Sequence, residues 1–283
     1  MRLIKKAITT TLARCGYGIA RIKQQSAIKD ERVVYHGHYL GHEFQCFKDG
    51  IISDAILTGR GWDVPLKEAL RDCFARKASR IVVEVGANIG ASFVPIANNF
   101  QDASFYLFEP VHEFFTLLQN NVKNYGLKHA QLMNLALSDE HGRSITLRVD
   151  MQNAGTGNPL PDTYPLSVDT TTLDRYFGGR DIAFLKVDTD GSELAVLRGG
   201  ARLIRRCQPD IFVEFHPILM RTLSVSPASL LDTLFDLGME LFTVYDSSGT
   251  LLETTSSRGR ILEIADGAEF YVDLLARSGD RAK

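Results

Sequence analysis

The sequence predicts an α/β fold, in which helices cover both faces of a mostly parallel sheet and an antiparallel hairpin closes one edge. From residue 80 onward, continuous apolar runs alternate with helical patterns, which is typical of parallel strands buried on both sides. The expected strands are RIVVEV, SFYLFE, AQLMNLA, IAFLKVD and IFVEF, and the expected helices span residues 63–77, 91–100, 111–125, 193–205 and 227–237. Near the C-terminus, ELFTVYD, RILEIA and EFYVDLL follow without full intervening helices, so we place the hairpin there.

The composition argues against several classes of protein. The formal net charge of −2 disfavours a nucleic-acid-binding protein, which normally carries a basic surplus. No apolar run approaches the roughly 20 residues that span a bilayer. The four cysteines are far apart, so neither a zinc site nor a disulfide framework is indicated, and we expect a cytoplasmic protein.

Residues 1–25 differ from the rest of the chain. Their apolar residues recur at helical spacing, and no acidic residue occurs before Asp30. Such a basic amphipathic helix can pack on its own domain or on a sister subunit, or lie on the anionic inner surface of a membrane. Residues 31–62 are expected to form short strands and turns. Within them, His36, His38 and His42 either bind a metal or simply belong to a half-exposed strand and turn.

The stretch VVEVGANIG, residues 82–90, predicts a nucleotide-binding loop between a strand and a helix. A dinucleotide fingerprint needs G-x-G-x-x-G, which lets the backbone approach a pyrophosphate. Here Gly86 and Gly90 are four residues apart, Asn88 stands where the middle glycine would be, and Glu84 lies at the end of the strand. A carboxylate there repels pyrophosphate but favours a cation. The loop therefore points away from NAD and toward S-adenosylmethionine, which carries an amino group and a sulfonium.

Two further strand ends carry candidate nucleotide contacts. Glu109 ends the next strand, where a carboxylate accepts hydrogen bonds from ribose hydroxyls in many nucleotide sites. The alternative is that Glu109 is an acid favoured by a helix N-terminus, with Pro110 at the first helical position. After the third strand, Ala136, Leu137 and Ser138 could line an adenine slot.

Taken together, these motifs resemble the FkbM-type S-adenosylmethionine-dependent methyltransferases. The matching pieces occur in the family's order over about residues 80–217: VVEVGANIGAS, FEP, NLALSDEHG, TTTLD, AFLKVDTDGSELAVLRGG and PDIFVEFHP. Asp190 departs from the family, which usually has glutamate there. The resemblance implies a Rossmann-like class I methyltransferase fold, with a mostly parallel seven-stranded sheet, and hydroxyl acceptors on sugars or polyketide-like metabolites.

The resemblance and the strand ends together give a set of expected cofactor contacts and a domain division. The expected contacts to S-adenosylmethionine are Glu84, Gly86, Asn88, Gly90, Ser92, Glu109, Pro110, Ala136, Leu137, Ser138 and Asp188. We expect the N-terminal helix and short strands over residues 1–60, the methyltransferase domain over 61–276, and a polar tail over 277–283. Residues 150–165 form a long loop that is either a lid over the site or a surface connection.

The expected catalytic side chains lie at the ends of the fourth and fifth strands. Alternation places Lys186 and Asp188 on one side of their strand, and Glu214 and His216 on one side of theirs. His216 could accept the proton of a hydroxyl acceptor, with Glu214 or Asp188 orienting its ring. Two alternatives stay open. A divalent cation could be held by Asp188, Asp190, Glu214 and His216. Alternatively, Lys186 and a carboxylate form a structural ion pair, with Glu193 an acid in the first turn of a helix.

The sequence therefore favours an S-adenosylmethionine-dependent O-methyltransferase that acts on a hydroxyl of a saccharide or another small-molecule or glycan-like acceptor. The alternatives are a catalytically inactive cofactor-binding module and an NAD-linked oxidoreductase or epimerase. A membrane-associated glycan precursor would suit residues 1–25 if that helix touches the membrane.

Overall fold

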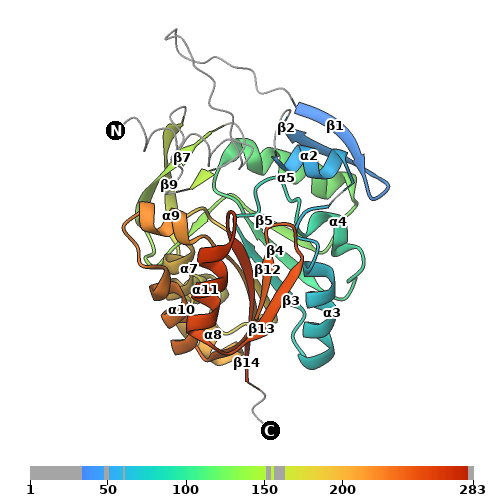
Figure 1. Cartoon of the computed structure of the whole chain (residues 1–283). Coiled ribbons are helices and arrows are strands. Elements are labelled where there is room, and N and C mark those ends of the chain that lie inside the picture. Colours follow the sequence, from blue (N-terminus) through green and yellow to red (C-terminus); the bar gives the residue numbers. More distant parts are fainter. Residues whose placement is uncertain (1–33, 48–50, 60, 151–153, 156–162, 280–283) are drawn as a thin grey trace.

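A computed structural model describes residues 34–47, 51–59, 61–150, 154–155 and 163–279 (Figure 1). The described residues form an eight-stranded sheet in the order β13-β12-β14-β11-β10-β3-β4-β5. Its strands are β3 (Ile81–Val85), β4 (Ser104–Phe108), β5 (Ala130–Met133), β10 (Phe184–Val187), β11 (Asp210–Phe215), β12 (Met239–Asp246), β13 (Leu251–Thr255) and β14 (Val272–Ser278). Neighbours from β5 to β11 are parallel, whereas β14, β12 and β13 pair antiparallel. The expected parallel sheet with an antiparallel edge is confirmed, and β13 makes it one strand wider than expected.

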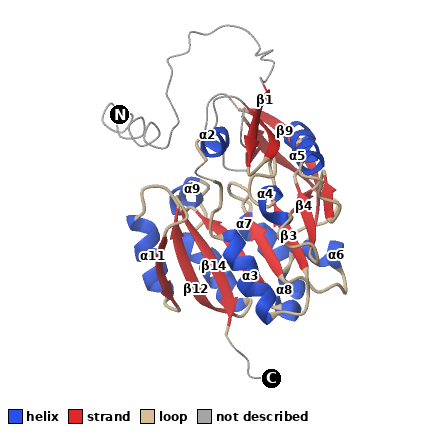
Figure 2. Ribbon diagram, turned by 90° about the vertical axis from the view of Figure 1, so that its right-hand side faces the viewer, coloured by secondary structure: helices blue, strands red, loops and turns tan. Residues whose placement is uncertain are grey.

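Helices cover both faces of this sheet (Figure 2). One face packs on α3 (Leu66–Arg76), α4 (Val94–Ala97) and α5 (His112–Asn124), and the other packs on α6 (Leu173–Phe177), α7 (Glu193–Gly199), α8 (Ala201–Cys207), α10 (Pro227–Asp236) and α11 (Arg258–Gly267). Strand alternation produces the two layers, because Val82 belongs to the first hydrophobic cluster and Val83 to the second. The apolar strands read from the sequence are therefore buried on both sides.

The structure corrects three expected elements. RILEIA is not a strand but lies in α11, where Ile261 and Ala265 are one turn apart and buried, and Ser257 caps the first turn. The helix expected over 193–205 is divided at Gly200 into α7 and α8, and Gly199 approaches the carbonyl of Ser138 so closely that a Cβ atom would overlap with it. The helix expected over 91–100 is reduced to the short α4.

The N-terminal part of the described chain packs into the same core. β1 (Val34–Tyr39) and β2 (His42–Phe47) form an antiparallel hairpin, in agreement with the short strands and turns expected over residues 31–62, whereas α2 (Ile51–Leu57) was not expected. Asn121 of α5 bonds both backbone groups of Gln45, and Phe47 packs on Phe114 at 5.6 Å between ring centroids. Residues 1–25, with the predicted amphipathic helix, lie outside the described residues. At the other end β14 extends to Ser278, into the expected tail.

A small sheet is inserted between β5 and β10. It has the order β6-β9-β7-β8, from β6 (Ala136–Leu137), β7 (Ser144–Val149), β8 (Ala154–Gly155) and β9 (Tyr164–Thr171). Most of the loop expected over 150–165 lies outside the described residues, but β8 falls within it. Gly155 lies so close to Asp190 that a Cβ atom would overlap with that residue. The insertion thus reaches the carboxyl edge of the large sheet.

None of the helices that the structure describes is long and apolar enough to cross a bilayer.

Candidate active site

The glycine loop lies where the order of the large sheet reverses. The chain runs from β3 outward through β4 to β5, then returns to β10 on the other side of β3. Ligands of open α/β sheets bind at this switch point, beyond the carboxyl ends of the strands. Gly86 has φ +88° and lies against the carbonyl oxygen of Asp188, which a Cβ atom would overlap. Gly90 has φ +86°, and a Cβ atom there would lie 2.6 Å from a side-chain carbon of Val94 and 2.7 Å from one of Leu118.

A buried lysine joins three carboxylates beside this loop. Lys186 Nζ lies 2.8 Å from Asp188 Oδ2, 3.0 Å from Asp63 Oδ2 and 3.5 Å from Glu84 Oε1. Lys186 and Glu84 are direct neighbours in register across β10 and β3. Burial acts to lower the pKa of Lys186, but the three carboxylates together raise it well above its usual range. The ion pair considered from the sequence is therefore present, and it extends to Glu84 and Asp63.

Asp63 is a member of the site that we did not anticipate. The sequence suggested a helix from residue 63, but α3 begins at Leu66, and Asp63 precedes it in a left-handed conformation with φ +47°. Its Oδ2 accepts a hydrogen bond of 2.6 Å from Ser92 Oγ. Gly61 and Pro65 flank Asp63, and this turn-forming pair is the signal that could have revealed it.

Glu84 has the properties expected of a contact to a cationic group. Its side chain is completely buried, and neither carboxylate oxygen has a hydrogen bond of ordinary geometry to a described residue, although the nearby Ser92 hydroxyl acts to lower its pKa. Burial raises its pKa to about 8, even though Lys186 opposes the rise. A buried carboxylate without a hydrogen-bond donor is costly, so a ligand amino group beside it would complete the site. The loop therefore fits the methionyl part of S-adenosylmethionine.

Glu109 lies at the end of β4 and holds the glycine loop. Its Oε2 accepts from the backbone N–H of Asn88 at 2.9 Å, and its Oε1 accepts from that of Val111 at 2.8 Å. Burial raises its pKa to about 7 against these two bonds. Each oxygen retains a further lone pair for a ribose hydroxyl. The helix-end alternative is also partly right: Val111 is the N-cap of α5, and Pro110 therefore precedes the helix instead of beginning it.

The segment after β5 pairs with β9 and packs against α7. Ala136 and Leu137 are buried in β6, which pairs parallel with β9. The backbone N–H of Ser138 donates to Thr171 O at 2.9 Å, and its hydroxyl donates to Asp139 Oδ1 at 3.2 Å. The adenine contact of these residues stays a prediction.

His216 is oriented differently from our expectation. Its Nδ1 accepts a 3.2 Å hydrogen bond from the backbone N–H of Leu219, so the ring caps α9 (Pro217–Thr222). Within the described part of the chain, neither Glu214 nor Asp188 orients the ring. Burial lowers the pKa of His216. When Nδ1 accepts this bond, the proton of the neutral ring lies on Nε2.

The expected alternative metal set is not assembled. No group of three or more histidine, cysteine, aspartate or glutamate side chains among the described residues is close enough to hold a metal ion. Glu193 instead supports the loop after β10, since its carboxylate accepts from the backbone N–H groups of Thr189 and Gly191. It lies in the first turn of α7, as the structural interpretation predicted.

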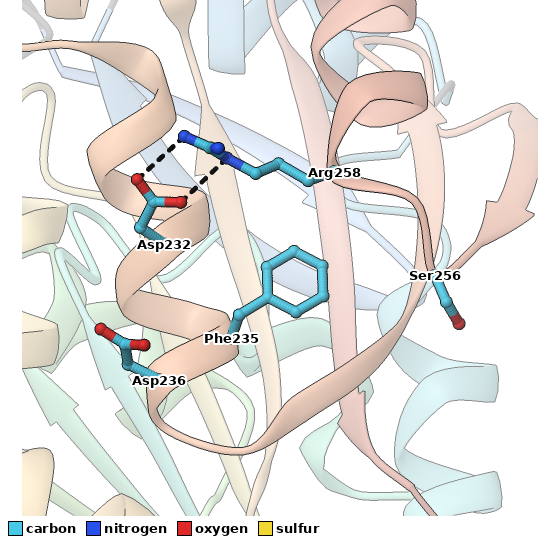
Figure 3. Close-up of a pocket in the computed structure, with 5 residues that line it drawn as sticks. All are labelled: Asp232, Phe235, Asp236, Ser256 and Arg258. Atoms are coloured by element: carbon cyan, nitrogen blue, oxygen red, sulfur yellow. Dashed lines mark hydrogen bonds and ion pairs between the residues drawn. The ribbon is translucent and has the colours of Figure 1, made fainter.

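A surface pocket between α10 and α11 lies away from these residues (Figure 3). Its lining residues are Asp232, Phe235, Asp236, Ser256 and Arg258. Arg258 forms two 2.9 Å contacts with Asp232 across it. It lies where α10 and β13 end, which is the amino edge of the parallel strands. It is therefore not the nucleotide site.

The parallel sheet with its switch-point glycine loop and acidic strand ends defines the class of S-adenosylmethionine-dependent methyltransferases. The family model described as "Methyltransferase FkbM domain" matches residues 84–241, and the chain belongs to this family. S-adenosylmethionine is accordingly its cofactor. The expected family is thus confirmed over more than half of the chain.

Several solved structures are similar to this chain. An FkbM methyltransferase from Methylobacillus flagellatus KT is 17% identical over 70% of this chain and 43% of its own, with a TM-score of 0.41. The chain thus spans less than half the length of that relative. M. jannaschii TYW2 in complex with AdoMet is 12% identical over 89% of each chain, with a TM-score of 0.45. Magnesium protoporphyrin IX methyltransferase from Synechocystis PCC 6803, with bound SAH, is 11% identical over 97% of this chain and 99% of its own, with a TM-score of 0.41. No curated protein matches the sequence significantly.

Proposed function

We propose that the protein transfers the methyl group of S-adenosylmethionine to a hydroxyl of a saccharide or glycan-like acceptor. The observation that carries the proposal is the acidic end of β11 and its neighbour β14. There Glu214 and Asp273 lie beside Asp188, and neither forms an ion pair with a described cationic side chain. Carboxylates stabilise the protonated ammonium form of an amine acceptor, and an ammonium has no lone pair with which to attack the methyl group. A hydroxyl acceptor keeps its lone pairs, and the same carboxylates can accept its hydrogen bond or its proton.

The cofactor supplies an electrophilic methyl group, and this chain supplies its binding and orientation. Glu84 would bind the amino group and Glu109 the ribose hydroxyls, while the backbone of Gly86 allows close approach. Residues 136–138 would line the adenine. Lys186 keeps Asp63 and Asp188 in place, so it acts as a positioning residue. Proximity and orientation then account for much of the acceleration.

A hydroxyl acceptor must lose its proton as it attacks. Glu214 and His216 lie at the carboxyl end of β11 and are the groups that we propose for this step. His216 Nδ1 is engaged by Leu219, so the ring would accept a proton only after this bond or its tautomer changes. Glu214 has no such hydrogen bond to break. Burial together with neighbouring carboxylates raises its pKa well above the usual range, so it would have to lose its own proton before it serves as the base. A carboxylate with a raised pKa is a stronger base.

The proposal is tested by incubating the full chain with S-adenosylmethionine and a panel of methyl glycosides, amino sugars and phenols. Release of S-adenosylhomocysteine and the mass of the product are measured. We expect an O-methyl ether on a glycoside. Methylation of amines alone would contradict the proposal, and cofactor binding without any transfer would favour an inactive binding module. Tight binding of NADH with none of S-adenosylhomocysteine would favour the oxidoreductase alternative.

Cytoplasmic location and contact with the inner membrane surface through residues 1–25 also stay predictions. Deleting these residues and measuring flotation with anionic liposomes tests the contact. We expect the deleted protein to lose flotation and keep cofactor binding. Equal flotation of both proteins would contradict the membrane role.

A further inference from the structure

The edge of the site contains a carboxyl pair that the sequence did not suggest. Asp273 lies in β14, directly opposite Glu214 of β11 in the antiparallel register. Directly opposite residues have Cβ atoms about 5 Å apart and project to the same face of the sheet. On this face Phe212 is in register with Lys186, and Glu214 follows Phe212 by two residues. Glu214 and Asp273 therefore share this face with Glu84 and Lys186 but lie two residues nearer the carboxyl edge, level with Asp188.

Asp273 is buried without a partner. Only 7% of the residue is exposed, and it forms no hydrogen bond or ion pair with any described residue. Neither of its oxygens belongs to the fully enclosed, unbonded polar atoms, so both keep some accessible surface. Glu214 is half-buried and likewise makes no hydrogen bond within the described chain. Buried polar groups in native proteins are almost always hydrogen-bonded, so these oxygens point to a ligand that donates.

The neighbours of the pair do not supply that donor. The charged groups that act on its two members are Asp63, Asp188, Lys186, Asp246, Asp190 and Glu193. The only cation among them, Lys186, already contacts three other carboxylates. Next to the pair, the rings of His216 and Tyr271 lie 6.0 Å apart between centroids. Burial and these carboxylates raise the pKa of both Glu214 and Asp273 well above the usual range.

We propose that Glu214 and Asp273 together bind two neighbouring hydroxyl groups of the acceptor, so that the enzyme selects polyols with adjacent hydroxyls. The inference rests on the proposed function and deepens it. Two adjacent sugar hydroxyls are a few ångströms apart, which suits two carboxyl groups on directly opposite residues. Asp273 is then a specificity-determining residue, contributed by the antiparallel strand that lies between β11 and β12.

The test measures glycoside binding separately from turnover. Saturation-transfer NMR on the full chain with bound S-adenosylhomocysteine gives dissociation constants for methyl mannoside and methyl glucoside, and for their monodeoxy analogues. We expect at least one diol to bind, and Asp273→Asn to weaken it about tenfold, as for loss of a hydrogen bond to a buried side chain. Each matched deoxy analogue should bind weakly to the wild type and lose little in the variant.

Two controls separate a folding defect from a binding defect. Glu240→Gln removes an exposed acid at the opposite end of the neighbouring β12, so diol binding should not change. Asp273→Asn itself should bind S-adenosylhomocysteine within about twofold of the wild type. Glu214→Gln should weaken diol binding as Asp273→Asn does.

Each remaining outcome decides the matter. Diol binding that survives Asp273→Asn unchanged overturns the inference, as does a wild type that binds no glycoside or prefers amino sugars. Glycosides that bind through Asp273 but are never methylated uphold the diol site and contradict the proposed reaction. If a glycoside is methylated and Asp273→Asn has no effect on its binding, the proposed reaction is upheld and the diol site is contradicted.

Discussion

At the scale of single residues, the ionic network around Lys186 is the feature on which stability depends most. It is 2% exposed and contacts carboxylates from three separate segments of the chain. Removing one partner of a buried ionic network leaves the others uncompensated, which usually costs about 3–5 kcal/mol. The sequence suggested the strand position of Lys186 and its partner Asp188. It did not suggest Asp63, because a helical reading of that segment hides a residue whose left-handed backbone directs it into the site.

Lys186→Met tests this network. We expect the free energy of unfolding, measured in urea at pH 7.5, to fall by about 3 kcal/mol. The loss should shrink at pH 5, because the carboxylates left without their cation can then bind protons. Lys128→Met, at an exposed position, is the matched control and should change stability little. A loss equal in the two variants would show that Lys186 does not organise the acids.

The two acids of the cofactor site predict a pH dependence of binding. Glu84 and Glu109 have pKa values raised to about 8 and about 7, so both are largely protonated near pH 6 in the free protein. An amino group and ribose hydroxyls favour the ionised carboxylates, so binding should release protons. The affinity for S-adenosylhomocysteine should therefore rise from pH 6 to pH 8 and level off above.

Calorimetry in buffers of different ionisation enthalpy measures this proton release directly. Glu109→Gln should bind more weakly and release fewer protons. Affinity that is constant or falls between pH 6 and pH 8 in the wild type would contradict the assignment of these two carboxylates.

At the scale of elements, local pattern and long-range pairing contribute differently. The buried strands were readable because an apolar run between helical patterns is a local signal. The pairing of Glu214 with Asp273 could not be predicted from the sequence, because β14 enters the sheet between β11 and β12 and no local pattern encodes that insertion. RILEIA was predicted as a strand for a related reason: an apolar segment of six residues is too short to distinguish a strand from part of a helix. Ser257, a good N-cap, is the sign that we overlooked.

The glycine loop permits a sharp comparison between two substitutions. Gly86 and Gly142 both have positive φ, +88° and +74°, so alanine is strained at either position. A Cβ atom would meet the Asp188 carbonyl at Gly86 and nothing within 4 Å at Gly142. Both variants should lose about 1 kcal/mol from the strained backbone. Gly86→Ala should in addition displace the loop from β10 and abolish binding of S-adenosylhomocysteine, as measured by calorimetry. If Gly142→Ala impaired binding equally, close approach would not be the reason for glycine at 86.

At the scale of the whole molecule, the carboxyl edge of the sheet concentrates acids that folding has to bury. Glu84, Glu109, Glu214 and Asp273 come from four strand ends, and each has a raised pKa. Such a group binds its proton more tightly in the folded than in the unfolded protein. Its contribution to stability is therefore present at low pH and is lost as pH rises through the folded pKa. Lowered pKa values elsewhere, such as that of Asp246, have the opposite sign but lie below this range.

The cofactor-free protein should consequently become less stable between pH 6 and pH 8.5, which differential scanning calorimetry measures as a falling Tm. Glu84→Gln removes the member with a pKa of about 8, so its Tm should fall less over the same interval. Bound S-adenosylhomocysteine should also reduce the fall in the wild type, because it supplies the donors that the ionised acids lack. A Tm that falls equally steeply in Glu84→Gln would mean that the acid beside the glycine loop is not a source of the instability. The loss of stability would then have to come from the Glu214–Asp273 pair, and Asp273→Asn should reduce the fall of Tm with pH instead.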